Sequence, residues 1–167
     1  MKPASFPLSK RTSTCRFVAA SVVSESLLPS NLLSLDTPEN AYDFWQSIVS
    51  AEVDHEPQKE SLIIVLNNSS HRPYAWNRVS LGTLTETNCH PREVLRPAIA
   101  GAAHSFVLMH NHPSGDPHPS RADDMFTRRI LEAAKLLCID LLDHLIIGTP
   151  APGRTPYFSF REAGIIP

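Results

Sequence analysis

The sequence predicts an α/β domain in which a mixed β-sheet is covered by helices. Short apolar runs of strand length, rich in β-branched residues, alternate with longer segments whose apolar residues recur every three to four positions. The first two predicted strands are joined by a turn, which indicates an antiparallel pair, and helices separate the later strands. A sheet that mixes both kinds of connection follows.

The bulk composition is that of one globular domain. At 167 residues and 42% apolar content, the chain can bury a core, and no run approaches the ~18 apolar residues of a membrane span. A net charge of −2 provides no overall electrostatic footprint for nucleic acid, although a local basic patch stays open. Cys15, Cys89 and Cys138 are odd in number and lack Cys-x-x-Cys spacing, which predicts reduced thiols in a cytoplasmic protein.

The N-terminal segment, residues 1–36, is rich in Ser, Thr and Pro. It contains no acidic residue before Glu25, a composition that transit peptides share. A disordered or poorly packed tail is the favoured interpretation, because nothing else marks an organelle. We therefore expect a tail over residues 1–36 and one domain over residues 37–167.

The domain is predicted to begin with an amphipathic helix. Thr37 is a good N-cap and Pro38 suits the first helical position. Apolar side chains then recur at helical spacing over about three turns: Ala41, Phe44, Trp45, Ile48 and Val49. The charged connection over residues 51–59 carries Asp54, His55 and Glu56, which we interpret as a solvated loop, since neighbours on a loop rarely converge on one ion.

Two strands and a second helix are predicted next. Ser61–Leu66, which Glu60 opens, is a continuous apolar run typical of a strand buried on both faces. After a turn over residues 67–73, Tyr74–Leu84 predicts an antiparallel partner, interrupted near Gly82. Pro91 starts a helix that ends near Gly101, with these apolar residues facing inward: Val94, Leu95, Ala98 and Ile99.

The C-terminal half is predicted to add strands on either side of a third helix. His104–Met109 reads as a buried strand that delivers His110 at its end. Ser120 is a good N-cap for the helix, with Asp123 at its capping-box position. The apolar face of this helix comprises Phe126, Ile130, Ala133, Ala134 and Leu137. A strand over residues 139–148, broken by Asp143 and His144, a short strand over residues 157–160 and a turn over residues 161–164 complete the chain.

A hydrolytic metal site is predicted within residues 110–123. Side chains two apart on an extended strand lie on one face, so His110 and His112 can bind one ion. Asp123 is a suitable third ligand, because the first turn of a helix favours an ionised carboxylate. Two histidines and one carboxylate leave a fourth tetrahedral position for water, the pattern of catalytic zinc, with iron, manganese or nickel still open.

A water in such a site needs a base, and Glu60 is the candidate. A carboxylate at the start of a buried strand is unexpected without a task, although an ordinary exposed residue is the alternative. The hydroxyl of Ser120 caps the helix and could also donate to a developing oxyanion. Two nearby residues are set aside: the flanking prolines restrict the direction of His118, and Asp124 points about 100° round the helix from Asp123. Asp116, after a glycine, reads as a turn residue.

These residues also resemble a known family. His-x-His, seven residues, Ser, two residues and Asp is similar to the JAMM motif of the JAB/MPN metalloprotease superfamily. The wording HNHPSGDPHPS resembles the RadC-like branch, as do GTLTETNCHPREVLRPAI before it and LLDHLIIG and YFSF after it. The resemblance covers residues 37–167 and implies a three-layer α/β/α, cytidine-deaminase-like architecture with one catalytic zinc per chain.

The resemblance also implies roles, position by position. His110, His112 and Asp123 match the metal ligands, Ser120 the serine that stabilises the tetrahedral intermediate, and Glu60 the glutamate on the first core strand. Full-length RadC proteins carry a helical region before this domain, where this chain has the Ser-rich segment. It therefore resembles the short members that consist of the catalytic domain.

Three functions are compatible with the sequence. The first is a zinc-dependent metallopeptidase or isopeptidase acting on a peptide or isopeptide-linked protein. The second is a RadC-like factor of DNA repair or recombination, which the near-neutral charge does not favour. The third is an inactive scaffold, which the complete ligand set argues against. The substrate and the oligomeric state are not indicated.

Overall fold

The structure is a computed structural model that describes residues 28, 32–82 and 89–167. Most of the predicted tail lies outside these residues, as do residues 83–88, on which the end of the second predicted strand falls. The reduced-thiol prediction can be followed at two of its three cysteines, and both, Cys89 and Cys138, are free. Within the described ranges, no helix is both long and apolar enough to cross a membrane.

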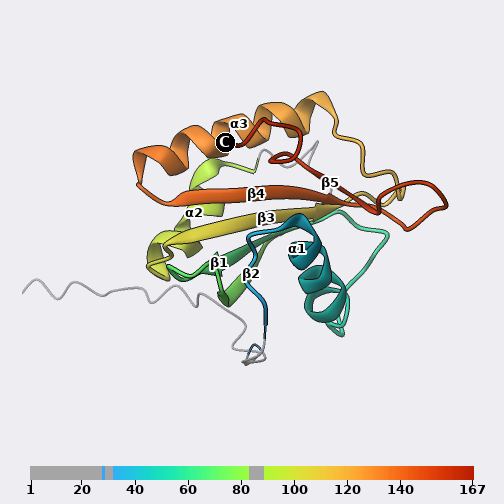
Figure 1. Cartoon of the computed structure of the whole chain (residues 1–167), viewed down its shortest axis with the longest axis horizontal. Coiled ribbons are helices and arrows are strands. Elements are labelled where there is room, and N and C mark those ends of the chain that lie inside the picture. The colour runs from blue at the N-terminus through green and yellow to red at the C-terminus, as the bar shows by residue number, and fades with distance from the viewer. Residues whose placement is uncertain (1–27, 29–31, 83–88) are drawn as a thin grey trace, which may run out of the picture.

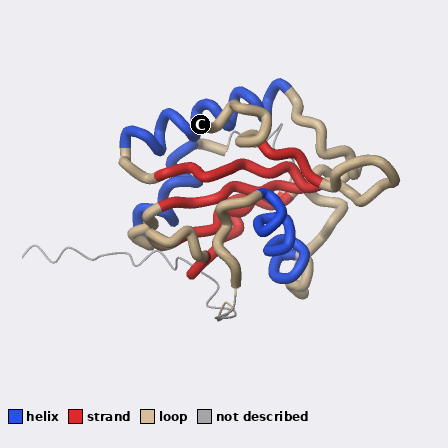
Figure 2. The backbone as a smooth tube through the Cα atoms, in the orientation of Figure 1, coloured by secondary structure: helices blue, strands red, loops and turns tan. Residues whose placement is uncertain are grey.

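A five-stranded mixed sheet forms the middle of three layers (Figures 1 and 2), which confirms the predicted α/β/α class. Its order is β2-β1-β3-β4-β5, and only β3 and β4 are parallel. The strands are β1 (Ser61–Asn67), β2 (Pro73–Leu81), β3 (Ser105–Asn111), β4 (Asp140–Ile147) and β5 (Tyr157–Ser159). Helix α1 (Pro38–Phe44), continued by the π-helical turn η1 (Trp45–Val49), covers one face, and α2 (Pro91–Ala100) and α3 (Arg121–Leu136) cover the other.

The alternation of side chains along β1 shows how one strand serves both layers. Leu62, Ile64 and Leu66 belong to the apolar cluster that contains residues of α2 and α3. Ile63 and Val65 belong to the second cluster, with residues of α1 and η1. All of β1 is buried, as its continuous apolar run predicts. Two cores, one on each face, therefore hold the sheet rigidly.

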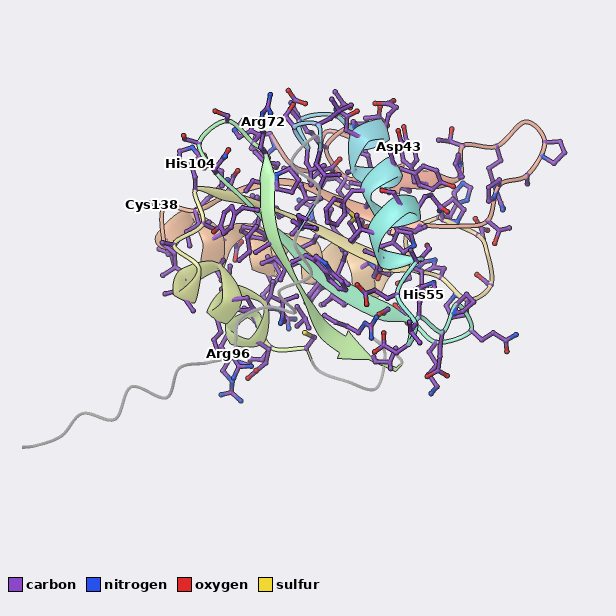
Figure 3. All side chains as sticks on the ribbon, turned by 90° about the horizontal axis from the view of Figure 1, so that it is seen from below. Asp43, His55, Arg72, Arg96, His104 and Cys138 are labelled. Atoms are coloured by element: carbon purple, nitrogen blue, oxygen red, sulfur yellow. The ribbon has the colours of Figure 1, made fainter. Side chains whose placement is uncertain are left out.

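The strand directions bring three chain segments to one end of the sheet. Strand β1 runs antiparallel to β3 with Leu62 opposite His110, so the residue before β1 arrives beside the end of β3. The loop after β3 leads to the N-terminus of α3 at the same end. In Figure 3, His104 and Cys138, which precede β3 and β4, lie toward the opposite end, and His55 lies toward this one. The predicted site residues are thus gathered by topology.

Several local predictions need correction. The helix expected over residues 38–49 changes to π geometry at Trp45, where the hydroxyl of Ser47 donates to the carbonyl of Asp43 and so competes with regular pairing. The interruption predicted near Gly82 is confirmed, since β2 ends at Leu81 and Gly82 takes a φ of +140°. Residues 83 and 84 of the predicted strand lie outside the described residues. Strand β3 extends to Asn111, so His110 lies within it.

Two residues predicted to face the core are exposed. Ile99 is 55% exposed because it lies at the border of the buried stripe of α2, which is centred between Val94 and Ala98. Leu137 is 44% exposed because α3 has already ended and Leu137 is its C-cap. The caps themselves are confirmed: Thr37, Ser120 and Gly101 occupy the predicted positions.

Candidate metal centre

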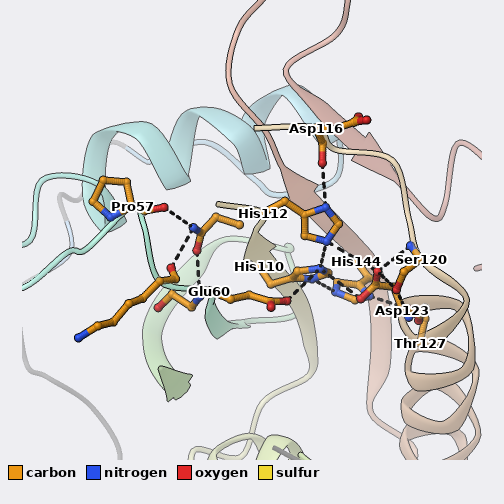
Figure 4. A network of polar contacts seen from close by, with 12 residues as sticks. Pro57, Glu60, His110, His112, Asp116, Ser120, Asp123, Thr127 and His144 are labelled. Atoms are coloured by element: carbon orange, nitrogen blue, oxygen red, sulfur yellow. Dashed lines mark hydrogen bonds and ion pairs between the residues drawn. The ribbon is translucent and has the colours of Figure 1, made fainter. Parts of the chain in front are cut away.

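The side chains of Glu60, His110, His112 and Asp123 converge beside the end of β3 (Figure 4). One ligand atom from each lies within 4.8 Å of all the others. His110 Nε2 lies 3.1 Å from His112 Nε2 and 3.4 Å from Asp123 Oδ1, and His112 Nε2 lies 3.7 Å from Asp123 Oδ2. Atoms bound at 2.0–2.1 Å to a tetrahedral zinc lie about 3.3 Å apart, so these spacings suit one ion.

The two histidines reach the site from one strand and the turn that follows it. His110 is fully buried and faces α3, on the same side as Phe106 and Leu108. His112, two positions on, lies beside it with a ring-centroid separation of 5.0 Å. Its Nδ1 lies 2.8 Å from the carbonyl oxygen of Asp116, which can only accept, so Nδ1 carries the proton. The Nε2 lone pair of His112 therefore faces the other site residues.

Asp123 is held by the helix that it caps. Ser120 and Asp123 form a complete capping box, as predicted. Asp123 Oδ2 accepts from the backbone N–H of Ser120 at 2.8 Å and from its hydroxyl at 2.6 Å. Oδ1 is the oxygen nearest to His110. One carboxylate thus completes the N-terminal cap of α3 and presents an oxygen to the site. The hydroxyl proton of Ser120 points to Asp123 Oδ2.

Glu60 lies just before β1, with Oε1 3.9 Å from His110 Nε2 and only 14% of its side chain exposed. Asn111, between the two histidines, fixes this approach. Its side-chain oxygen accepts from the N–H of Ser61 at 2.9 Å, and its amide nitrogen donates to the carbonyls of Pro57 and Lys59. No sequence pattern assigned a role to Asn111, because its partners lie 50 to 54 positions away, in β1 and the segment before it.

Two further buried polar side chains, His144 and Thr127, lie behind His110. His144 of β4 is fully buried, and its Nε2 lies 2.8 Å from His110 Nδ1. Thr127 of α3 contacts the other nitrogen of His144. Burial, followed by the charge of His110, holds the pKa of His144 well below its usual value, so this ring is neutral. The only sequence signal for His144 is that it interrupts an apolar strand.

The charges of the site favour a cation. Burial alone would raise the pKa of Asp123, but the hydrogen bonds that His110 and His112 donate in their protonated forms hold it well below its usual range, so the carboxylate is ionised. The hydrogen bond with Asp123 in turn raises the pKa of His112. A carboxylate and a ring lone pair that converge at this spacing fit a metal ion, or a proton in its place.

The residues that sequence analysis set aside lie outside the four-residue group. His118 is 77% exposed in its side chain and pairs with Asp116, its Nδ1 lying 2.7 Å from Oδ1. Asp124 is not a member either. In the loop before β1, Asp54 pairs with Arg78 at 2.7 Å. The ion pairs of His118 and Asp54 explain the positions of these two side chains without a metal.

Residues 35–165 match the family described as the RadC-like JAB domain. Similar curated proteins include the UPF0758 protein STH371 of Symbiobacterium thermophilum, 44% identical over 107 residues, which are 64% of this chain and 44% of the relative. UPF0758 proteins of Chlorobium luteolum (42% over 118 residues; 71% and 50%) and Trichlorobacter lovleyi (39% over 130 residues; 78% and 52%) are also similar. The chain spans about half the length of these relatives, and their names state no activity.

Proposed function

The chain belongs to the RadC-like JAB domain family, and on that premise we propose that it is a zinc-dependent hydrolase of peptide or isopeptide bonds. The observation that supports this proposal is the convergence of His110, His112 and Asp123 at ligand spacing, with the carboxylate of Glu60 beside them. Three such ligands with an open fourth position are the pattern of a catalytic site, whereas structural zinc sites are closed by four.

The proposed roles follow from the donors and acceptors of the chain. Zn²⁺ held by the two imidazoles and Asp123 would supply a Lewis acid and a water with a pKa near 7. Glu60 would accept a proton on its carboxylate and deliver it to the leaving amine. Glu60 Oε1 lies 3.9 Å from His110 Nε2. The carboxylate is therefore close enough to the ligands to contact a water bound to an ion that they would hold.

Ser120 is the proposed oxyanion donor. Its hydroxyl donates to Asp123 Oδ2 at 2.6 Å, so during the reaction it would exchange this partner for the oxygen of the tetrahedral intermediate. Its backbone N–H, which also donates to Asp123 Oδ2, keeps the carboxylate in place during that exchange. Loss of the hydroxyl should therefore lower kcat more than it lowers metal content.

The proposed substrate class is a peptide or an isopeptide-linked protein. A role on DNA stays a separate prediction, and no contact among the described residues favours it. A flat fluorescence-anisotropy titration with single- and double-stranded DNA at low salt would remove that alternative.

Metal content is the first test. Protein purified without chelator should contain about one zinc per chain, and His112→Ala should lose it while keeping its circular dichroism spectrum. His118→Ala is the matched control, because this histidine is exposed on the same loop and should leave metal content unchanged. A wild-type protein that stays metal-free after zinc soaking would refute the proposal.

Hydrolysis is the second test. A library of quenched fluorescent peptides, together with substrates linked through a lysine ε-amine, should be cleaved by the zinc-loaded protein. Glu60→Gln should keep the zinc and lose cleavage, since the amide cannot accept the proton. Cleavage that survives in Glu60→Gln at the wild-type rate would exclude Glu60 as the base.

A further inference from the structure

The turn that carries His112, residues 112–116, lies against the loop between β4 and β5, residues 148–156. The N–H of Thr149 in this loop donates to the carbonyl of Gly115 in the turn at 2.9 Å. Within the turn, the N–H of Gly115 donates to the carbonyl of His112, also at 2.9 Å. The loop and the turn are therefore joined through their backbones at Gly115.

The two segments approach so closely that only glycine fits at the contact. A Cβ added to Gly115 would lie 2.7 Å from the hydroxyl of Thr149. A Cβ added to Gly148 would lie 2.6 Å from the carbonyl oxygen of Gly115 and 2.7 Å from the ring of Pro117. Because neither segment leaves space for the other to shift, the position of the loop determines the position of the turn.

Arg154 joins the two segments by a side chain. Its Nη2 donates to the carbonyl of Gly115 at 2.8 Å and to the carbonyl of Thr149 at 3.1 Å. Its Nη1 lies 3.7 Å from Asp116 Oδ1. A planar guanidinium can hold these three acceptors at once, whereas the single nitrogen of a lysine cannot reproduce that geometry. The side chain of Arg154 is 35% exposed, so a substitution there leaves the two apolar cores intact.

The turn in its own right sets the direction of the His112 ring. The carbonyl oxygen of Asp116 lies 2.8 Å from His112 Nδ1 (Figure 4). Arg154 thus contacts Gly115 and Asp116, the two residues of the turn that contact His112. A shift of the turn would rotate the ring and move its Nε2 away from the other atoms of the four-residue group.

We propose that Arg154 is a positioning residue for His112 and acts through the turn over residues 112–116. The zinc-binding part of this inference rests on the proposed function, whereas the hold of Arg154 on the turn is a property of the zinc-free chain. The sign of the effect separates positioning from electrostatics. A guanidinium repels a nearby cation, so loss of its charge alone would strengthen zinc binding. Loss of the hold on the turn would weaken it, because zinc would then have to order His112.

Hydrogen exchange in the zinc-free protein, measured by NMR, tests the hold on the turn. The amide protons of Gly115 and Thr149 should exchange about fivefold faster in Arg154→Gln, the factor that corresponds to one lost hydrogen bond. Arg154→Lys should have the same effect, although it keeps the charge. Arg96→Gln is the control, because Arg96 pairs with Glu93 on α2 and should leave both rates unchanged.

Zinc affinity, measured by calorimetry, is the second readout. Both Arg154 variants should bind zinc about 10-fold more weakly, the lower end of the range for outer partners of metal ligands, since Arg154 acts through the backbone. A role in stability alone would lower the Tm of the zinc-free protein and leave the affinity unchanged. A role as a charge alone would tighten zinc binding in Arg154→Gln and leave Arg154→Lys like the wild type.

Three results would overturn the inference: wild-type zinc affinity in Arg154→Lys, tighter zinc binding in Arg154→Gln, or unchanged amide exchange in both variants. If Arg154→Gln does not fold, the exchange rates and zinc affinity of Arg154→Lys decide. A wild-type chain that binds no zinc would refute the proposed function, and the exchange rates would still show whether Arg154 holds the turn.

Discussion

Replacement of Asp143 by asparagine should stabilise the protein increasingly as pH rises. Asp143 is 3% exposed on β4, next to His144. Its Oδ1 accepts from the backbone N–H groups of His144 and Arg161, and its Oδ2 accepts from the hydroxyl of Ser159 at 2.6 Å. An asparagine can keep both backbone contacts through its oxygen, and its amide can donate to the Ser159 oxygen, which reverses the third contact. The substitution therefore removes mainly the charge.

The magnitude follows from two opposing effects. Burial raises the pKa of Asp143, while the three donors lower it, and burial prevails, so the pKa rises from 3.8 to about 6. A carboxyl with a raised pKa in the folded state favours the protonated form. The contribution of Asp143 to the free energy of unfolding is therefore most favourable below pH 3.8 and is lost as the pH rises to 6. At 1.36 kcal/mol per pH unit, the wild type loses about 3 kcal/mol over this range.

Urea unfolding of both proteins from pH 4 to pH 7 measures this loss. The free energy of unfolding of Asp143→Asn minus that of the wild type should rise by about 2 kcal/mol between these limits, since part of the change lies below pH 4. Other titrating groups cancel in the difference. A difference that stays constant, or that falls with pH, would show that the three donors outweigh burial.

Three further predictions concern the site and its loop. Gly115→Ala should destabilise the fold by about 1–3 kcal/mol, because the φ of Gly115 is +77° and a Cβ would lie 2.7 Å from a threonine hydroxyl. Gly153→Ala is the control in the same urea assay: the φ of Gly153 is +73° but a Cβ there would have no atom within 4 Å, so this variant measures the backbone strain alone. Ser120→Ala should lower the free energy of unfolding by about 1 kcal/mol through its N-cap, and an unchanged midpoint would exclude that cap. Zinc affinity, measured by calorimetry, should fall with decreasing pH from above the usual histidine range, because the neighbouring carboxylate raises the pKa of His112 and a proton competes with the metal; a flat profile would contradict this.

The elements were predictable because each depends on neighbours in sequence. Thr37, Ser120 and Gly101 cap helices by contacts within one turn, and the apolar run of β1 shows that both its faces are covered. The predictions that were wrong concern residues whose environment depends on distant partners or on where a helix ends. Leu137 continues the period of α3, and only the end of that helix exposes it.

The candidate site divides in the same way. The spacing of His110, His112 and Asp123 reveals possible ligands because one strand end and one helix start carry all three. Glu60 was a candidate because a carboxylate opens a buried strand, but its position beside the ligands depends on the antiparallel register of β1 on β3, which no local pattern contains. His144 was noticed only as an interruption of β4, because the atom that gives it meaning, His110 Nδ1, belongs to a residue 34 positions away.

The central claim is that one ion is held by two imidazoles and one carboxylate, with Glu60 outside its ligands. Anomalous diffraction at the zinc absorption edge, from crystals of protein purified without chelator, tests it most directly. We predict one peak per chain, about 2.0–2.1 Å from His110 Nε2, His112 Nε2 and Asp123 Oδ1. A peak bonded to Glu60 in place of Asp123, or a zinc-soaked crystal with no peak at these residues, would contradict the account.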